Sequence, residues 1–120
     1  MQIPPLQWIN LSRLVKGGSA PVPLRDASIA YDPAKRALIV FGGESAAGTP
    51  VQNTWILDFD SLVWRTPVPP DSQRDIPPAR SAALTGADLA SNIRSGFLVF
   101  GGKGGSGSTP LNDVWVRPFP

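Results

Sequence analysis

The chain has 120 residues, enough for one small domain and too few for two. Its 11 basic and 9 acidic residues form no charged run, so its charge gives no sign of binding to nucleic acid or membranes. It contains no Cys and no His, which excludes disulfides and removes the commonest general base and transition-metal ligand. We therefore expect no cofactor and no metal site.

The N-terminal residues 1–5 lack the charged start and apolar core of a signal peptide. No apolar run approaches the length needed to span a membrane. We therefore expect a soluble chain and favour a cytoplasmic location.

The distribution of Pro and Gly predicts an all-β fold. The 14 Pro and 12 Gly lie mostly between short apolar runs, a pattern typical of strands joined by many turns. No segment is predicted to be helical. In chain order, the predicted strands cover residues 6–11, 25–31, 38–41, 55–58, 62–65, 78–84, 97–100 and 112–116.

A short apolar run followed by Gly-Gly occurs twice, at residues 38–43 and 97–102. Each copy is followed by a loop, a Thr-Pro pair and a Trp. The segments that begin at Arg25 and Arg80 also resemble each other. The first pair of segments is 55 residues apart and the Phe-Gly-Gly runs are 59 apart. We assign this difference to loops, mainly a longer second hairpin at 86–92.

A repeat of about 50 residues and four short strands is typical of a propeller blade of the kelch type. The chain resembles the kelch family in four features that recur in order. They are an Arg at the first strand, Gly-Gly after the second, Asn or Asp before an aromatic residue in the third, and a Trp in the fourth. This resemblance implies an all-β fold of kelch-type β-propeller blades, each with four antiparallel strands. An unrelated β-sandwich is the alternative.

The predicted strands fall into groups of one, four and three, which amount to two blades. Residues 1–24 are expected to hold the fourth strand of a preceding blade and a connection. Residues 25–79 would form a complete blade, and residues 80–120 the first three strands of a second blade. Trp8 supports this offset because it precedes Arg25 by 17 residues, while Trp64 precedes Arg80 by 16.

Two blades cannot close a propeller ring, because rings use about four to eight. One interpretation is that the chain is a piece of a longer propeller. The other is that several copies complete one another as a homo-oligomer, with segment 6–11 of one chain closing the last blade of its neighbour.

The antiparallel order brings the start of the first strand, the end of the second and the start of the third to one rim. In kelch domains that bind peptides, the Arg-Ser of the first strand and the residue after Gly-Gly face the mouth of the central channel. The resemblance therefore implies a binding site made of Arg25, Asp26, Glu44, Arg80, Ser81 and Lys103. The alternative is that the two Arg hold loops through hydrogen bonds to the backbone.

The function predicted from these features is a protein-interaction module that binds a protein or peptide partner through the loops of one rim. One alternative is a fragment of a carbohydrate-acting enzyme, similar to the kelch-like mutarotases. Another is a purely structural, self-assembling propeller. We expect no catalytic residues, because the sequence shows no assembled catalytic set, and no nucleic-acid or membrane partner.

Overall fold

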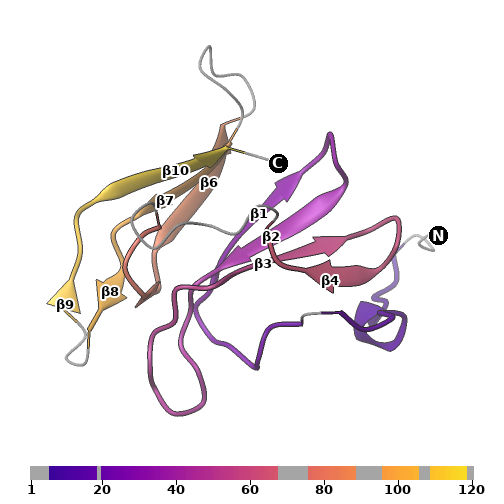
Figure 1. The fold of residues 1–120 in the computed structure, drawn as a ribbon, viewed down its shortest axis with the longest axis horizontal. Coiled ribbons are helices and arrows are strands. Elements are labelled where there is room, and N and C mark those ends of the chain that lie inside the picture. The colour runs from indigo at the N-terminus through magenta and orange to yellow at the C-terminus, as the bar shows by residue number, and fades with distance from the viewer. Residues whose placement is uncertain (1–5, 19, 68–75, 89–95, 106–108, 119–120) are drawn as a thin grey trace.

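The computed structural model describes residues 6–18, 20–67, 76–88, 96–105 and 109–118 (Figure 1). Within these ranges the regular elements are antiparallel β-strands and one 3-10 turn, η1 (Leu11–Arg13). In this part of the chain no helix is long and apolar enough to cross a membrane. The prediction of an all-β chain is therefore confirmed.

Residues 20–67, called unit 1 here, form a four-stranded antiparallel sheet with strands in chain order. Its strands are β1 (Ser28–Asp32), β2 (Ala37–Phe41), β3 (Thr54–Asp58) and β4 (Val63–Arg65). The turn between β1 and β2 is held by Asp32, whose Oδ1 accepts a hydrogen bond from the Ala34 backbone N at 3.0 Å. β1 begins three residues later than the prediction places it.

The described residues 76–118, called unit 2, form a three-stranded sheet and a smaller one. The larger has the order β10 (Val114–Pro118), β7 (Gly96–Phe100), β6 (Leu84–Asp88). The smaller has the order β5 (Arg80–Ser81), β8 (Lys103–Gly104), β9 (Thr109–Pro110). The prediction places the first strand at 78–84, where the structure has the short β5. The predicted hairpin at 86–92 overlaps β6, and its residues 89–92 lie outside the described part.

The strand register shows which positions of the two units correspond. Ser28 pairs with Phe41 in unit 1, and Leu84 pairs with Phe100 in unit 2. Because the two Phe end the repeated Phe-Gly-Gly runs, Ser28 corresponds to Leu84. The spacing at this point of the repeat is therefore 56 residues.

The predicted alignment of Arg25 with Arg80 is wrong by one position. Arg25 bridges Glu44, the residue after Gly-Gly in unit 1. In unit 2 it is Ser81 that pairs with the residue after Gly-Gly, Lys103. Arg25 therefore corresponds to Ser81, because the backbone pairing sets the correspondence and the shared residue type does not.

The backbone conformation of the following residue supports this correction. Asp26 and Ala82, which are 56 residues apart, have φ of 57° and 59°. Few residues other than Gly adopt this left-handed conformation, so its presence at both positions marks them as equivalent. Arg80 then has Leu24 as its counterpart in unit 1.

The strand expected at residues 6–11 is not formed in the structure of the single chain. Residues 7–10 have no regular structure, and the Asn10 side chain caps η1 by accepting a hydrogen bond from Ser12 N at 3.0 Å. The Trp8 side chain is fully exposed. A strand forms where its backbone can pair with another strand. Among the described residues, the N-terminal segment meets the β4 region only further along the chain, where Lys16 N donates to Leu62 O at 2.9 Å.

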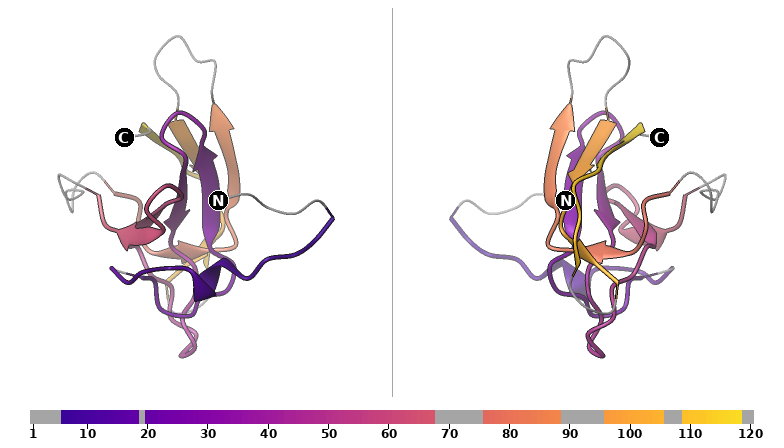
Figure 2. Two further views of the ribbon diagram at one scale, coloured as in Figure 1. Left: turned by 90° about the vertical axis from the view of Figure 1, so that its right-hand side faces the viewer. Right: turned by 90° about the vertical axis from the view of Figure 1, so that its left-hand side faces the viewer.

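The core lies between the larger sheets of the two units. β6 of unit 2 lies beside β1 of unit 1, as Figure 1 and both views in Figure 2 show. Burial of these side chains is the main force that joins the units. The buried core residues are Ala30, Ala37, Ile39, Phe41 and Ile56 from unit 1, and Phe97 and Val99 from unit 2.

Candidate functional site

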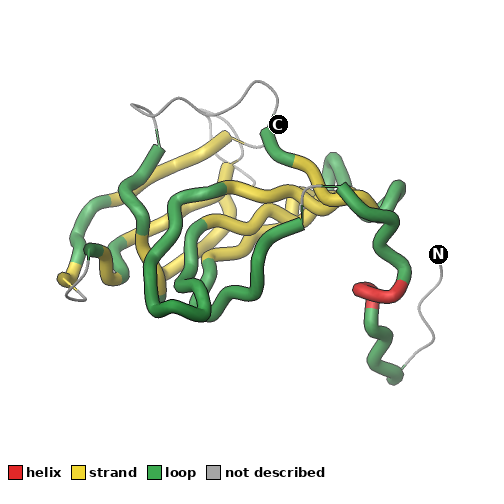
Figure 3. The backbone as a smooth tube through the Cα atoms, turned by 60° about the horizontal axis from the view of Figure 1, so that its bottom comes forward, coloured by secondary structure: helices red, strands yellow, loops and turns green. Residues whose placement is uncertain are grey.

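The predicted site residues lie near one end of the sheets, where Gly-Gly follows the second strand of each unit. Figure 3 brings this rim forward and shows its loops in green in front of the strands. Gly42 and Gly101 have φ of 69° and 67°, so the backbone leaves β2 and β7 in the same conformation. A Cβ on Gly42 would lie 2.8 Å from the Arg80 carbonyl oxygen, so this close approach requires glycine.

Arg25, Asp26 and Glu44 form the rim of unit 1. Arg25 Nε donates a hydrogen bond to Glu44 Oε2 at 3.0 Å, and their side chains are 67% and 12% exposed. The Nη groups of Arg25 make no hydrogen bond to other described residues. Asp26 is exposed. The rim of unit 1 therefore exposes two guanidinium nitrogens without a described hydrogen-bond partner and, nearby, the carboxylate of Asp26.

Lys103 and Ser81 form the corresponding rim of unit 2. Lys103 is half-buried and makes no ion pair with any described residue. Ser81 is buried, and its hydroxyl has no hydrogen-bond partner among the described residues. The ion pair of unit 1 thus has no equivalent here, and the ammonium group of Lys103 carries an unbalanced positive charge.

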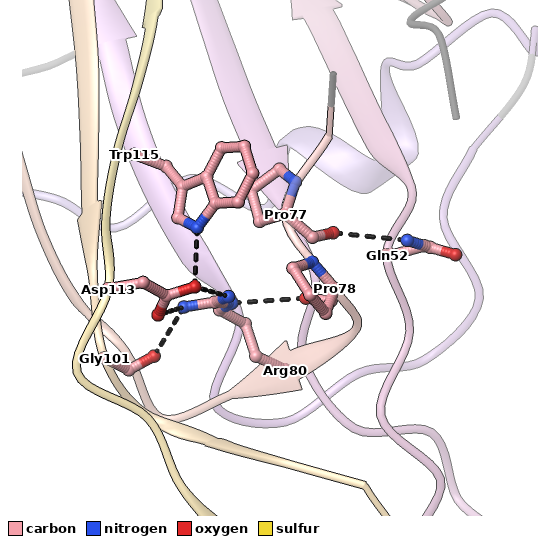
Figure 4. Close-up of polar contacts among 7 residues, drawn as sticks. All are labelled: Gln52, Pro77, Pro78, Arg80, Gly101, Asp113 and Trp115. Carbon is pink, nitrogen blue, oxygen red and sulfur yellow. Dashed lines mark hydrogen bonds and ion pairs between the residues drawn. The ribbon is translucent and has the colours of Figure 1, made fainter. Parts of the chain in front are cut away.

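Arg80 does not belong to the accessible surface, although the sequence placed it there. Its side chain is 0% exposed, and Nη1 and Nη2 each donate a 2.7 Å hydrogen bond to Asp113 (Figure 4). Nη1 also donates to the Gly101 carbonyl at 3.0 Å, and Nε donates to the Pro78 carbonyl at 3.2 Å. The alternative reading, an Arg that holds loops, is therefore the correct one for Arg80, whereas Arg25 remains exposed.

Asp113 is the residue that connects this cluster to the core. The hydrogen bonds from Arg80 and from Trp115 Nε1, the latter at 2.7 Å, hold the pKa of Asp113 well below its ordinary value of 3.8. Asp113 therefore stays ionised through most of the acidic range. The bidentate pair fixes the strand β10 to the start of unit 2.

Asp113 is not among the site residues predicted from the sequence, although it stands two residues before Trp115. The equivalent position of unit 1 is Asn53, since the backbone N of Gly42 and Gly101 donate to Asn53 O and Asp113 O respectively. The change from Asn to Asp accompanies the change from Leu24 to Arg80. This paired change is visible in the sequence once the alignment is shifted by one residue.

Two clefts lie between the units. One of 380 Å³ separates the rim loops and is lined by Gly48, Thr49, Pro50, Ala79 and Gly105. The other, of 270 Å³, lies between the sheets and is mainly apolar, with Phe41, Phe97 and Trp115 among its lining residues. The first cleft lies at the same end of the sheets as the exposed rim charges.

The described residues contain no group of three or more acidic side chains that could hold a metal ion. No protein-family model and no curated protein matches the chain.

Proposed function

We propose that the two units are kelch-type propeller blades and that the chain is a protein-interaction module. The support for the blade assignment is a meandering antiparallel sheet whose register recurs in both units. In each unit the start of the repeat also pairs with the residue after Gly-Gly. Such repeats usually bind partners through loops on one face of a rigid scaffold.

The observation that carries this proposal is the position of the rim loops. Loops from both units meet at one end of the sheets and line the cleft of 380 Å³. Exposed Arg25 and Asp26 lie at this end of unit 1, and half-buried Lys103 lies at this end of unit 2. A rigid rim with a narrow cleft and separated charges suits a peptide or protein loop.

The charges indicate which partner chemistry would bind. Glu44 is already paired with Arg25, whereas Lys103 has no described counter-ion. A partner carboxylate would therefore gain most by reaching Lys103 or the Nη groups of Arg25. Gly48, Pro50 and Gly105 add no charge to the cleft, which would accept a small side chain.

A peptide-display selection on the full chain tests this proposal. Peptides that bind should lose affinity about tenfold in the variants Arg25→Ala and Lys103→Ala, since a charged hydrogen bond contributes about 1.5–3 kcal/mol. The control variant is Lys35→Ala, which removes the same charge in the exposed turn between β1 and β2. Failure to enrich any peptide, or an equal loss in the control, would contradict the proposal.

A further inference from the structure

Unit 2 exposes an apolar sheet face on the side away from unit 1. Such a patch on a soluble domain commonly marks an interaction site. Its residues come from all three strands of the larger sheet. They are Leu84, Phe100, Val114 and Val116, which are 72%, 43%, 66% and 54% exposed.

This outer face corresponds to the face by which unit 1 packs against unit 2. The register places its four residues at the positions of Ser28, Phe41, Thr54 and Ile56. These four are 2%, 5%, 8% and 0% exposed, and Phe41 and Ile56 belong to the core between the units. The outer face of unit 2 is thus exposed to solvent, whereas the equivalent face of unit 1 is buried against unit 2.

Unit 1 carries the complementary face on its far side. Phe97, Val99 and Trp115 of unit 2 contact unit 1 within the chain, and Val40 and Trp55 occupy the equivalent positions of Val99 and Trp115. Val40 and Trp55 are each 8% exposed, so this part of the face is already covered within the chain. Ile29, which pairs with Val40 on the same face, is 54% exposed. Each unit therefore carries the positions of both halves of one interface. The outer half of unit 2 is exposed, whereas the far half of unit 1 is open along β1, at Ile29 and Tyr31.

Backbone hydrogen bonds across the junction inside the chain provide a second argument. Gly43 N donates to Arg80 O at 2.8 Å, and Arg80 N donates to Val51 O at 3.3 Å. Ala82 N donates to Asp26 O at 2.9 Å. These three bonds join the rim of unit 1 to the first residues of unit 2.

The equivalent groups at the two outer ends of the chain have no partners among the described residues. In unit 2 these groups are Gly102 N, Leu111 O and Ala82 O. In unit 1 they are Leu24 O, Leu24 N and Asp26 N. Leu24 O would accept from Gly102 N, Leu24 N would donate to Leu111 O, and Asp26 N would donate to Ala82 O. The two ends are therefore complementary, group for group.

The exposed segment around Trp8 fits the same scheme. Trp8 precedes Arg25 by 17 residues, and Trp64 precedes Ser81, the counterpart of Arg25, by the same number. Trp64 lies in β4, which precedes unit 2 in the chain but completes the sheet of unit 1 by pairing with β3. Segment 6–11 accordingly precedes unit 1 and would complete the sheet of whichever unit lies before it.

We propose that the chain associates head to tail with a second copy of itself. Unit 2 of one copy contacts unit 1 of the next copy in the way that unit 1 contacts unit 2 within the chain. The outer face of unit 2 packs on the Ile29 face of the next copy. Segment 6–11 of that copy adds to the edge of β10, with Trp8 opposite Arg117 and Ile9 opposite Val116. A second copy is the occupant because this one sequence supplies both complementary ends. The association does not involve a ligand at the rim.

This contact is heterologous, so it leaves one free end on each copy unless the assembly closes into a ring. If about four to eight units close a ring, the product contains about two to four copies. The mass of the purified chain, measured by light scattering and sedimentation, should therefore exceed that of one chain of 12.7 kDa.

Three charge-insertion variants test the geometry of the contact. Val114→Glu blocks the outer face of unit 2, Ile29→Glu blocks the opposite face of unit 1, and Ala34→Glu is the control in an exposed turn away from both. Each blocked variant alone should be a monomer, and the control should assemble like the original chain. An equal mixture of the two blocked variants should form complexes of two chains and no larger species.

Two outcomes of this experiment would overturn the proposal. One is an original chain that stays monomeric at every concentration up to its solubility limit. The other is an Ile29→Glu variant that remains dimeric while Val114→Glu does not, because the outer faces would then pair with each other. Circular dichroism of each variant verifies that it is folded.

Cysteine crosslinking tests the added strand separately, and the chain has no native Cys to interfere. Opposed positions on neighbouring strands have Cβ atoms about 4.5–5.5 Å apart, close to the range for a disulfide after a small adjustment. Copies with Ile9→Cys mixed with copies with Val116→Cys should give a covalent heterodimer. Copies with Ile9→Cys mixed with copies with Ala34→Cys should not. An assembled chain that yields no such crosslink would refute the strand addition.

Discussion

Arg80 and Asp113 form a bidentate ion pair in which the guanidinium is completely buried and both hydrogen bonds measure 2.7 Å. The pair connects the first residues of unit 2 to its last strand. In unit 1 the same two positions hold Leu24 and Asn53. One fold thus tolerates a charged and an uncharged arrangement at equivalent places.

Removing the carboxylate of Asp113 should destabilise the chain strongly. Asp113→Ala leaves the guanidinium of Arg80 buried without its counter-ion, a change that costs about 3–5 kcal/mol for a fully buried pair. We expect about 2–3 kcal/mol here, because the Asp113 side chain is 37% exposed. Urea unfolding measures the loss, and Asn53→Ala at the exposed equivalent position is the control. Equal losses in both variants would contradict this role of the pair.

Stability should fall in acid because of Asp113. Its pKa is lowered in the folded chain, so folding favours the ionised form. The contribution of the pair is present in full well above pH 3.8 and declines as the pH falls below that value toward the folded pKa. Urea midpoints measured from neutral pH downward should show this decline. In Asp113→Asn the decline should be smaller, and an unchanged profile would show that Asp113 is not its cause.

Replacing the whole pair by the unit 1 residues should restore most of the stability that the single change removes. The double variant Arg80→Leu, Asp113→Asn removes the buried guanidinium together with its counter-ion, and exchanging buried ion pairs for uncharged residues is often close to neutral. We expect it to be more stable than Asp113→Asn alone, with a clear coupling between the two sites. A double-mutant cycle in urea gives the coupling. Additive losses would mean that the residues act independently.

Gly42 should be essential for the close contact between the units. In Gly42→Ala the new Cβ would lie 2.8 Å from the Arg80 carbonyl oxygen, in addition to the strain of φ at 69°. Gly105→Ala is a matched control, since Gly105 also has φ of 69° but nothing within 4 Å of a Cβ. The control should lose about 1 kcal/mol from backbone strain, and Gly42→Ala clearly more. Equal midpoints of thermal unfolding for Gly42→Ala and Gly105→Ala would show that the contact with the Arg80 carbonyl does not require glycine.

The strands were predictable because the chain separates its apolar runs with Gly, Pro and Asp. Leu38 to Phe41 and Phe97 to Phe100 lie in β2 and β7, as their apolar character indicated. Which residues of the two units correspond was harder to predict from the sequence. The shared residue type suggested that Arg25 corresponds to Arg80. The strand pairing of Arg25 with Glu44 and of Ser81 with Lys103 shows that Arg25 corresponds to Ser81 instead.

The sequence indicated that the six rim residues lie at one end of the sheets, but it did not indicate which contacts each of them makes. The sequence placed Arg25 and Arg80 together as surface residues, yet one is exposed and the other buried. A guanidinium can be buried only with a counter-ion and further acceptors, and those of Arg80 lie 21 and 33 residues away at Gly101 and Asp113. Such distant partners leave no local pattern in a single sequence.

The left-handed backbone at Ala82 makes this position a point for engineering. A Cβ disfavours φ of 59°, whereas glycine adopts it freely. Ala82 is exposed, so its methyl group contributes little to the core, and the hydrogen bond from its backbone N to Asp26 O does not depend on the side chain. Ala82→Gly should therefore relieve backbone strain at the junction between the units and raise the midpoint of thermal unfolding.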